Sequence, residues 1–244
     1  MGGAAAALSR SINFQRLAAP PPRWDDALFW TFHATVGGLV RLWVRLRVEG
    51  SPPAAGGFVL AANHTSLFDP ILLGASIRRR IVFLMSETLW RSPALGWFYR
   101  WNRAIPLSSR GGNREALRAA RQVLQQHRVV GIFPEGGLSR DGLLMLGNPG
   151  AVSLVLNEGL PVVPVGILGA ADVLPPGASL PRFRRVTIRF GEPLQPADFD
   201  RLGSDRRTRL KDATATIMRR IAALTGQVAR EDALAGARSG AAAR

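Results

Sequence analysis

Short apolar segments alternate with helix-like patterns along this 244-residue chain, and that alternation leaves few folds open. The apolar segments lie at 57–62, 81–85, 129–133 and 161–168, and Gly, Pro or charged residues bound them. A short apolar run of this kind is typical of a strand that is buried on both faces. Strands separated by helices favour a parallel sheet with helices on its faces. We therefore expect an α/β fold with a mostly parallel central sheet flanked by helices.

The intervening segments have the apolar spacing of helices. Asn113 can cap a helix whose apolar stripe consists of Ala116, Leu117, Ala120, Val123 and Leu124. Further helices are expected at 150–157 and from near Ser204 to Gly226, with an alternating strand at 186–190 between them. No internal repeat is visible, so one folded domain over 48–226 is the expected organisation.

The two ends of the chain differ from this domain. Residues 1–22 are Ala-rich and reach Pro22 without an apolar period, and 227–244 is rich in Ala, Gly and Arg, so both are expected to be flexible tails. The segment 23–47 is expected to form a helix at a membrane interface. Its uncharged run from Ala27 to Val40 is shorter than the roughly 17–25 residues of a bilayer crossing. Tryptophans flank or interrupt the run and arginines follow it, as at a lipid headgroup layer. A buried core helix is the alternative.

The charge balance points to an anionic partner. The chain has 32 Lys and Arg against 17 Asp and Glu, a net charge of +15, and every basic residue except Lys211 is Arg. Nucleic acid, anionic lipid headgroups or phosphorylated small molecules would suit this surplus. Part of the Arg excess can instead reflect the base composition of the coding DNA. Aromatic residues are not interleaved with the arginines as in single-strand nucleic-acid binders, so no nucleic-acid partner is expected.

Several chemistries are excluded by composition or by missing motifs. The chain has no Cys, which excludes disulfides, thiolate metal sites and a Cys nucleophile. Only three His residues are present, so no metal site is expected. The sequence contains no GxSxG elbow, no GxxxxGK[ST] loop and no GxGxxG after a strand.

The segment 63–70, NHTSLFDP, follows an expected strand and precedes an expected helix. Open α/β sheets bind ligands at this end of a strand. A carboxylate such as Asp69 can hold one ring nitrogen of His64, fixing its tautomer and favouring a role as general base. Asp69 followed by Pro70 is also a common helix start, and His64 can be an ordinary loop histidine.

Two further segments carry candidate binding residues. Glu135 and Gly136 directly follow an expected strand, although Pro134 and the glycines also fit a plain turn. Arg110 precedes the helix after Asn113, where it could hold a phosphate together with the free N–H groups of that helix. A solvated surface arginine is the equal alternative.

Four segments in order, NHTSLFDP, IPLSSR, FPEGGLSR and LPVVPVGI, resemble the four blocks of the glycerolipid acyltransferases, above all the 1-acyl-sn-glycerol-3-phosphate acyltransferases. The likeness covers roughly 48–224, and it implies that the domain 48–226 is an acyltransferase domain. It implies that His64 is the general base and that Asp69 orients it. It also implies that Arg110 holds the phosphate of the acceptor, with Glu135 and Gly136 in the third block. Pro164 would lie near the acyl chain.

The third block departs from the family pattern, which usually reads FPEGTRS. Gly137 and Leu138 replace Thr and Arg, and the nearest basic residue is Arg140, a candidate for binding the substrate. The basic residue that commonly precedes the glycine matching Gly150 is also missing. Both changes remove donors for a phosphorylated acceptor, so another lyso-lipid, such as a lysophospholipid or a lyso-aminolipid, stays open as acceptor.

The resemblance implies an enzyme that moves a fatty acyl group to the free hydroxyl of lysophosphatidic acid and gives phosphatidic acid. No cofactor is implied, because acyl-CoA or acyl carrier protein brings the thioester as a co-substrate. The expected partners are these substrates and an anionic membrane surface, at the cytoplasmic face of the cell membrane. The alternative of another class is a lipid-surface binding protein without catalysis.

Overall fold

The computed structural model describes residues 12–139, 144–174, 180–200 and 205–227. The strands are β1 (Arg47–Glu49), β2 (Phe58–Ala62), β3 (Ile81–Ser86), β4 (Ile105–Leu107), β5 (Val129–Ile132), β6 (Val162–Leu168) and β7 (Thr187–Phe190). The N-terminal helices are α1 (Phe14–Ala18), α2 (Arg23–Phe32), the π-helix η2 (His33–Gly37) and α3 (Gly38–Trp43). The remaining helices are α4 (Asp69–Ser76), α5 (Glu87–Trp90), α6 (Gly96–Trp101), α7 (Arg114–Gln125), α8 (Pro149–Glu158), α9 (Ala170–Val173), the 3-10 helix η3 (Pro196–Phe199) and α10 (Arg206–Thr225).

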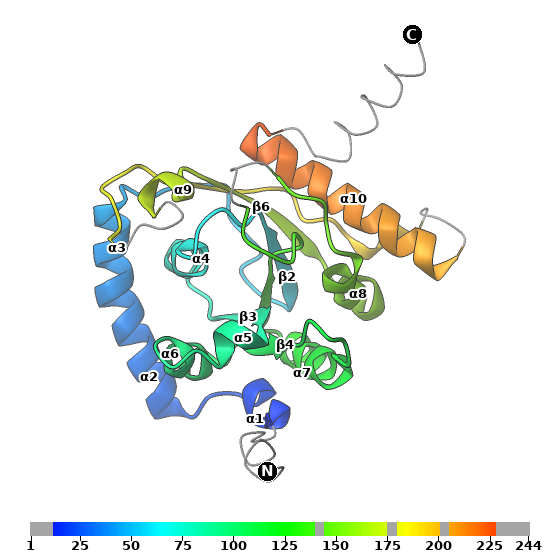
Figure 1. Cartoon of the computed structure of the whole chain (residues 1–244), viewed down its shortest axis with the longest axis horizontal. Helices are drawn as coiled ribbons and strands as arrows, with labels where there is room; N and C mark the ends of the chain where they lie inside the picture. Colours follow the sequence, from blue (N-terminus) through cyan, green and yellow to red (C-terminus); the bar gives the residue numbers. More distant parts are fainter. Residues whose placement is uncertain (1–11, 140–143, 175–179, 201–204, 228–244) are drawn as a thin grey trace, which may run out of the picture.

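The described strands form one sheet of seven in the order β1-β7-β6-β2-β5-β3-β4. β2 pairs in parallel with β5 and β6, while β7 is antiparallel to β6. The parallel pairs β3·β5 and β3·β4 extend the sheet to one side of β2. The expected α/β fold with a mostly parallel sheet flanked by helices is therefore confirmed (Figure 1).

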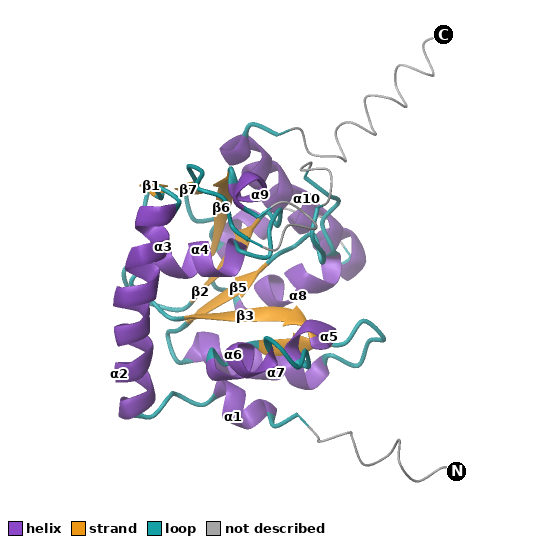
Figure 2. Ribbon diagram, turned by 60° about the vertical axis from the view of Figure 1, so that its left-hand side comes forward, coloured by secondary structure: helices purple, strands orange, loops and turns teal. Residues whose placement is uncertain are grey.

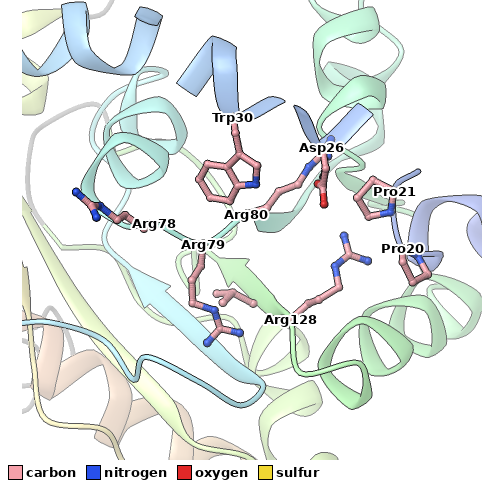
Figure 3. Close-up of a pocket in the computed structure, with 9 residues that line it drawn as sticks. Pro20, Pro21, Asp26, Trp30, Arg78, Arg79, Arg80 and Arg128 are labelled. Atoms are coloured by element: carbon pink, nitrogen blue, oxygen red, sulfur yellow. Dashed lines mark hydrogen bonds and ion pairs between the residues drawn. The ribbon is translucent and has the colours of Figure 1, made fainter. Parts of the chain in front are cut away.

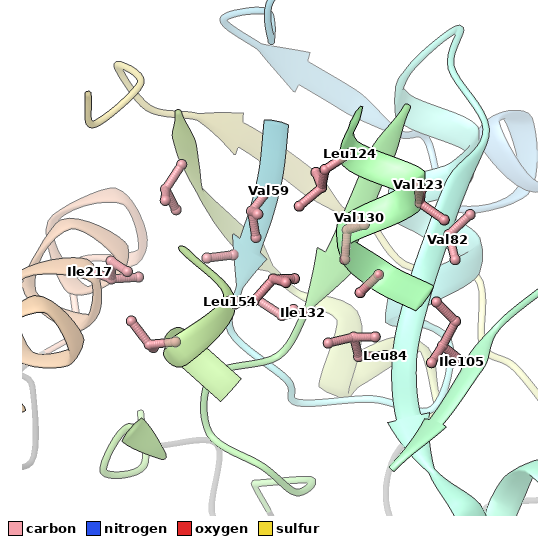
Figure 4. Close-up of a cluster of buried hydrophobic side chains, with 14 of the residues drawn as sticks. Val59, Val82, Leu84, Ile105, Val123, Leu124, Val130, Ile132, Leu154 and Ile217 are labelled. Carbon is pink, nitrogen blue, oxygen red and sulfur yellow. The ribbon is translucent and has the colours of Figure 1, made fainter. Parts of the chain in front are cut away.

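Alternate residues of the central strands point into two separate cores. Val59 and Ala61 of β2 belong to the core beneath α7, α8 and α10, together with Ile217 of α10 (Figure 4). Phe58 and Leu60 belong to the core on the opposite face, beneath α4. Because the side chains of a strand alternate between the faces of a sheet, both faces need a layer of helices. The runs that read as wholly apolar in the sequence are the strands covered on both sides.

The N-terminal part differs from the expected flexible tail of residues 1–22. Residues 1–11 lie outside the described residues, but α1 packs on α7, and Leu17 and Ala18 are buried there. Leu17 joins the core beneath α7, which is why this short helix is held to the domain. The tail prediction is therefore wrong for residues 12–22, whose short helix carries too little apolar periodicity to be recognised from the sequence.

The expected helical segment at 23–47 is observed as one helical run through α2, η2 and α3, followed by β1. This run passes along one side of the molecule and packs against α4 through η2 and α3 (Figure 2). None of the helices among the described residues is both long and apolar enough to cross a membrane. Several short elements, among them β4, α5, α6, α9 and η3, were not expected from the sequence, since each has too few residues to show a period.

Gly131 of β5 lies where the sheet leaves no space for a side chain. It lies between Leu60 of β2 and Phe83 of β3 in the register of the sheet. An added Cβ would lie 2.5 Å from Phe83 Cε1 and 2.7 Å from Ile81 Cγ2. The absence of a side chain at this position therefore lets the Phe83 ring lie across β5.

We expect Gly131→Ala to lower the free energy of unfolding by about 1–3 kcal/mol, because overpacking a core displaces side chains. Urea denaturation measures this change. The control is Gly74→Ala in α4, where a Cβ meets nothing within 4 Å, and where the better helix propensity of Ala predicts unchanged or slightly raised stability. Equal stability of the two variants would contradict the packing interpretation.

Candidate functional site

The segment after β2 brings His64 and Asp69 together at the carboxyl edge of the sheet. His64 Nδ1 lies 2.9 Å from Asp69 Oδ2. The His64 side chain is 16% exposed, and its Nε2 has no hydrogen-bond partner among the described residues. A ring that is held at Nδ1 and open at Nε2 has the arrangement required of a general base. The predicted proximity of these two residues is observed.

Asp69 does more than start a helix. Its Oδ2 also accepts hydrogen bonds from the backbone N–H groups of Thr65 and Ser66, at 2.8 Å each. These donors precede α4, so the carboxylate folds the loop back onto the helix start, with Pro70 at the first turn. The side chain is 0% exposed. Burial raises the pKa of Asp69, and the hydrogen bond and charge of His64 oppose that rise.

The third block holds the main chain of His64 from both sides. Glu135 Oε1 accepts a hydrogen bond from the His64 N–H at 2.7 Å, and the Ser139 N–H donates to the His64 carbonyl at 2.8 Å. The second carboxylate oxygen of Glu135 accepts from the Met145 N–H at 2.9 Å. Glu135 is 7% exposed, and burial raises its pKa, while the two amide hydrogen bonds oppose the rise. In this arrangement Glu135 is a positioning residue, and its expected substrate contact stays a prediction.

Two residues that the sequence analysis did not single out complete the support of His64. The ring of Phe133 stacks on the imidazole with centroids 4.0 Å apart, and Phe83 stacks on Phe133 in turn. The buried side-chain amide of Asn63 donates to the Ile167 carbonyl and accepts from the Ile167 N–H, which ties the loop to β6. Their places directly after strands, beside His64 and Glu135, are the signal that could have indicated these roles.

The other predicted binding residues are not joined to His64. Gly136 has a positive φ of 72°, which favours glycine, and an added Cβ would lie 3.2 Å from Asn148 Nδ2. Arg110 follows β4, which is the third strand from β2 and lies roughly 14 Å from it, so Arg110 is at the same edge as His64 but not beside it. Its side chain is exposed and has no partner among the described residues. Arg140 lies outside the described residues.

The helix after Arg110 begins differently from the expectation. Asn113 occupies the N-cap position of α7, but its side chain makes no cap hydrogen bond. Instead, Asn113 Oδ1 accepts from the Ser108 N–H at 2.7 Å, and its Nδ2 donates to the Ser108 carbonyl at 2.9 Å. Asn113 therefore shapes the loop that carries Arg110.

The arrangement of His64 and Asp69 is suited to proton transfer by His64. Among the residues that the structure describes, no group of three or more His, Asp or Glu side chains could hold a metal ion. His64 Nε2 can take a proton from a bound hydroxyl, and Asp69 can stabilise the resulting imidazolium. A rigid backbone around His64 keeps this nitrogen in place.

Comparison with known proteins places these residues in a family. The Acyltransferase family model matches residues 45–168, about half of the chain. A 1-acyl-sn-glycerol-3-phosphate acyltransferase of Bacillus subtilis is 28% identical over 177 residues, covering 72% of this chain and 85% of the relative. The chloroplastic 1-acyl-sn-glycerol-3-phosphate acyltransferase LPAT1 of Arabidopsis thaliana is 24% identical, covering 68% of this chain and 47% of the relative. The chain thus spans about half the length of its chloroplastic relative.

A solved structure has the same fold. The crystal structure of the 1-acyl-sn-glycerophosphate (LPA) acyltransferase PlsC from Thermotoga maritima superposes with a TM-score of 0.65. The two chains are 24% identical, and the superposition covers 86% of each. The superposition therefore shows a shared fold, a mostly parallel sheet with flanking helices.

We expect Glu135→Gln to lower the free energy of unfolding by about 1–3 kcal/mol, because one of the two buried N–H groups loses its acceptor. Urea denaturation measures the loss. Glu192→Gln is the control, since Glu192 is exposed and has no partner among the described residues, and it is expected to leave the stability unchanged. A Glu135→Gln variant as stable as this control would contradict the role of Glu135 in holding the His64 main chain.

Proposed function

Because this chain belongs to the acyltransferase family, we propose that it transfers a fatty acyl group from a thioester to the free hydroxyl of lysophosphatidic acid, giving phosphatidic acid. The observation that carries the proposal is the His64–Asp69 pair, held at 2.9 Å with the far nitrogen of the imidazole open. The names of the relatives support lysophosphatidic acid as acceptor. The donor is acyl-CoA or acyl carrier protein.

The reaction needs one proton transfer in each direction. His64 Nε2 takes the proton of the acceptor hydroxyl while the oxygen attacks the thioester carbonyl. The tetrahedral intermediate collapses to the ester, the C–S bond breaks, and the imidazolium returns the proton to the leaving sulfur. Asp69 stabilises the imidazolium between these steps, and general-base catalysis of this kind contributes ~10²–10⁴-fold in rate. No protein ester forms, so a single His is sufficient.

The position of Arg110 supports a phosphorylated acceptor. Its free guanidinium lies on the same sheet edge as His64, and Arg forms bidentate contacts with phosphate oxygens. The uncharged residues Gly137 and Leu138, where the family usually has Thr and Arg, favour a second candidate, in which the acceptor is another lyso-lipid. The two candidates differ in their dependence on Arg110.

The outer face of the N-terminal helical run supports association with a membrane. Trp24, Leu28, Leu39 and Leu42 are exposed along α2 and α3, while Asp25, Phe29 and Gly37 turn toward the domain. No charged residue lies between Asp26 and Arg41. An uncharged apolar face of this kind can lie among lipid headgroups, with the exposed Arg45 after α3 near their phosphates. We place this surface at the cytoplasmic face of the cell membrane, where thioester donors are available.

We expect His64→Ala to reduce acyl transfer to lysophosphatidic acid at least about a hundredfold, because the general base is lost. Asp69→Asn should reduce it by a similar factor, since an amide cannot stabilise the imidazolium by its charge. Release of the free thiol from a labelled acyl donor measures both. Binding of the His64→Ala variant to liposomes should persist, which shows that the protein is folded. Full activity of His64→Ala would refute the role of His64.

We expect Arg110→Gln to raise KM for lysophosphatidic acid about tenfold, because a charge-assisted contact to phosphate is lost. The same variant should use an acceptor without a phosphate, such as monoacylglycerol, as the unaltered protein does. Arg118→Gln, an exposed change of equal charge on α7, is the control. An unchanged KM for lysophosphatidic acid in Arg110→Gln would favour the second candidate acceptor.

A further inference from the structure

An arginine-lined cleft of about 340 Å³ lies at the amino edge of the sheet, away from His64. Arg78, Arg79 and Arg80 line it from the turn before β3, and Arg128 lines it from the residue before β5. His64 and Glu135 follow the opposite ends of parallel strands. The five residue steps from Arg128 to Phe133 span about 16 Å of extended chain, so the cleft and the proposed catalytic site lie at opposite edges.

The cleft has an excess of positive charge. Four arginines line it against one carboxylate, Asp26 (Figure 3). Arg80 already pairs with that carboxylate, with Nη1 3.4 Å from Asp26 Oδ1, and with the buried Asp25 behind it, at 3.6 Å from Oδ2. Arg78 is exposed and has no partner among the described residues. An anion entering the cleft would therefore meet more positive charge than the protein itself neutralises.

Two of these guanidinium groups are incompletely satisfied. Nη2 of Arg128 and Nε of Arg80 are buried and have no acceptor within the described part of the chain. Arg80 is 8% exposed. Burial, together with the charges of Arg80 and Arg103, lowers the pKa of Arg128 to about 10. Clustered and desolvated cations of this kind destabilise one another, and a bound anion would relieve the repulsion.

Main-chain carbonyl groups hold the lining arginines in place. Arg79 donates to the Gly56 carbonyl at 2.7 Å and to the His127 carbonyl. Arg128 Nη1 donates to the Ala18 carbonyl at 3.0 Å. These carbonyls carry no net charge, so they fix the guanidinium groups without neutralising them. Because these side chains are already ordered, binding a ligand costs little of their conformational entropy.

The remaining walls of the cleft place it beside the apolar helix α2. Figure 3 shows Trp30 of α2 on one side of the cleft, with Pro20 and Pro21 at the end opposite Arg78. Trp30 lies between the exposed Leu28 of α2 and the exposed Leu39 and Leu42 of α3 along the helical run. If α2 lies in a membrane interface, a headgroup phosphate would lie at the same depth as the cleft beside Trp30. This step rests on the membrane association given under the proposed function.

We propose that this cleft is a second anion site, which binds a phosphate group carried by an anionic lipid or free in solution. Arginine suits such a site, because a planar guanidinium can form bidentate contacts with phosphate oxygens. The site is separate from the phosphate contact proposed for Arg110, because it lies at the other edge of the sheet. Its occupant would fix the orientation of the domain on a membrane without taking part in acyl transfer.

The test compares two double variants that lose the same charge. Arg78→Gln/Arg128→Gln removes two cations of the cleft, whereas Arg118→Gln/Arg220→Gln removes two exposed arginines of α7 and α10. Both are made in an Arg110→Gln background, so that the catalytic edge contributes little to phosphate binding. Circular dichroism checks that each variant is folded, and no measurement depends on turnover, so a failure of the proposed function would leave this test intact.

In the soluble arm, the unfolding temperature is measured against inorganic phosphate at constant ionic strength. A ligand that binds only the native state raises this temperature. The control variant is expected to be stabilised, and the cleft variant to need about tenfold more phosphate for the same shift. This outcome would support a site open to free phosphate.

In the membrane arm, binding is measured on vesicles of phosphatidylcholine with and without phosphatidic acid. The ratio of the affinity for phosphatidic acid vesicles to that for pure phosphatidylcholine vesicles is expected to be about tenfold lower in the cleft variant than in the control. Binding to pure phosphatidylcholine should be equal in the two variants. A loss in this arm alone would support a lipid headgroup as the occupant. Equal behaviour of the two variants in both arms would overturn the proposal.

If the loss of Arg128 unfolds the protein, Arg78→Gln alone replaces the double variant. Its unchanged binding in both arms would overturn the proposal equally.

Discussion

The buried carboxylate of Asp69 organises the loop that carries the proposed general base, His64. A charge that is removed from water is stable only when hydrogen bonds and an opposite charge replace the lost solvation. Asp69 Oδ2 collects three donors, from His64, Thr65 and Ser66, while Oδ1 has no partner in the described structure. Two of these donors are backbone groups, so satisfying the carboxylate also sets the course of the chain between β2 and α4. The same interaction that folds the loop aims the imidazole.

Sequence blocks that lie far apart serve this single loop. β5 is the parallel neighbour of β2, with Ala61 opposite Ile132, so the residues after both strands meet at one edge. Glu135 and Ser139 can therefore hold the N–H and the carbonyl of His64, as a neighbouring strand would. On the other side, Asn63 joins the loop to β6. The order of strands in the sheet, rather than closeness in sequence, explains why these blocks occur together.

How much could be predicted from the sequence follows from the range of the interactions involved. The strands at 58–62 and 129–132 were predicted because burial on both faces leaves a continuous apolar run. The His64–Asp69 contact was predicted because its partners are five residues apart in one loop. The role of Glu135 could not be derived in this way, since it depends on β5 being the neighbour of β2. The docking of α1 on α7 escaped prediction because two buried residues are too few to form a pattern.

The structure also changes the interpretation of the arginine excess. Arg80 and Arg103 donate to the main-chain carbonyls of Trp101 and Arg16, and Arg79 and Arg128 bind carbonyls in the same way. A planar guanidinium with several donors can hold a carbonyl and still present N–H groups elsewhere, which an ammonium does less well. The base composition of the coding DNA could explain the number of arginines, but it does not explain why four of them close the amino edge of the sheet around one cleft. At that edge the main-chain carbonyls hold the guanidinium groups in fixed positions, so the positive charge is part of the fold, and the proposed phosphate site depends on this property.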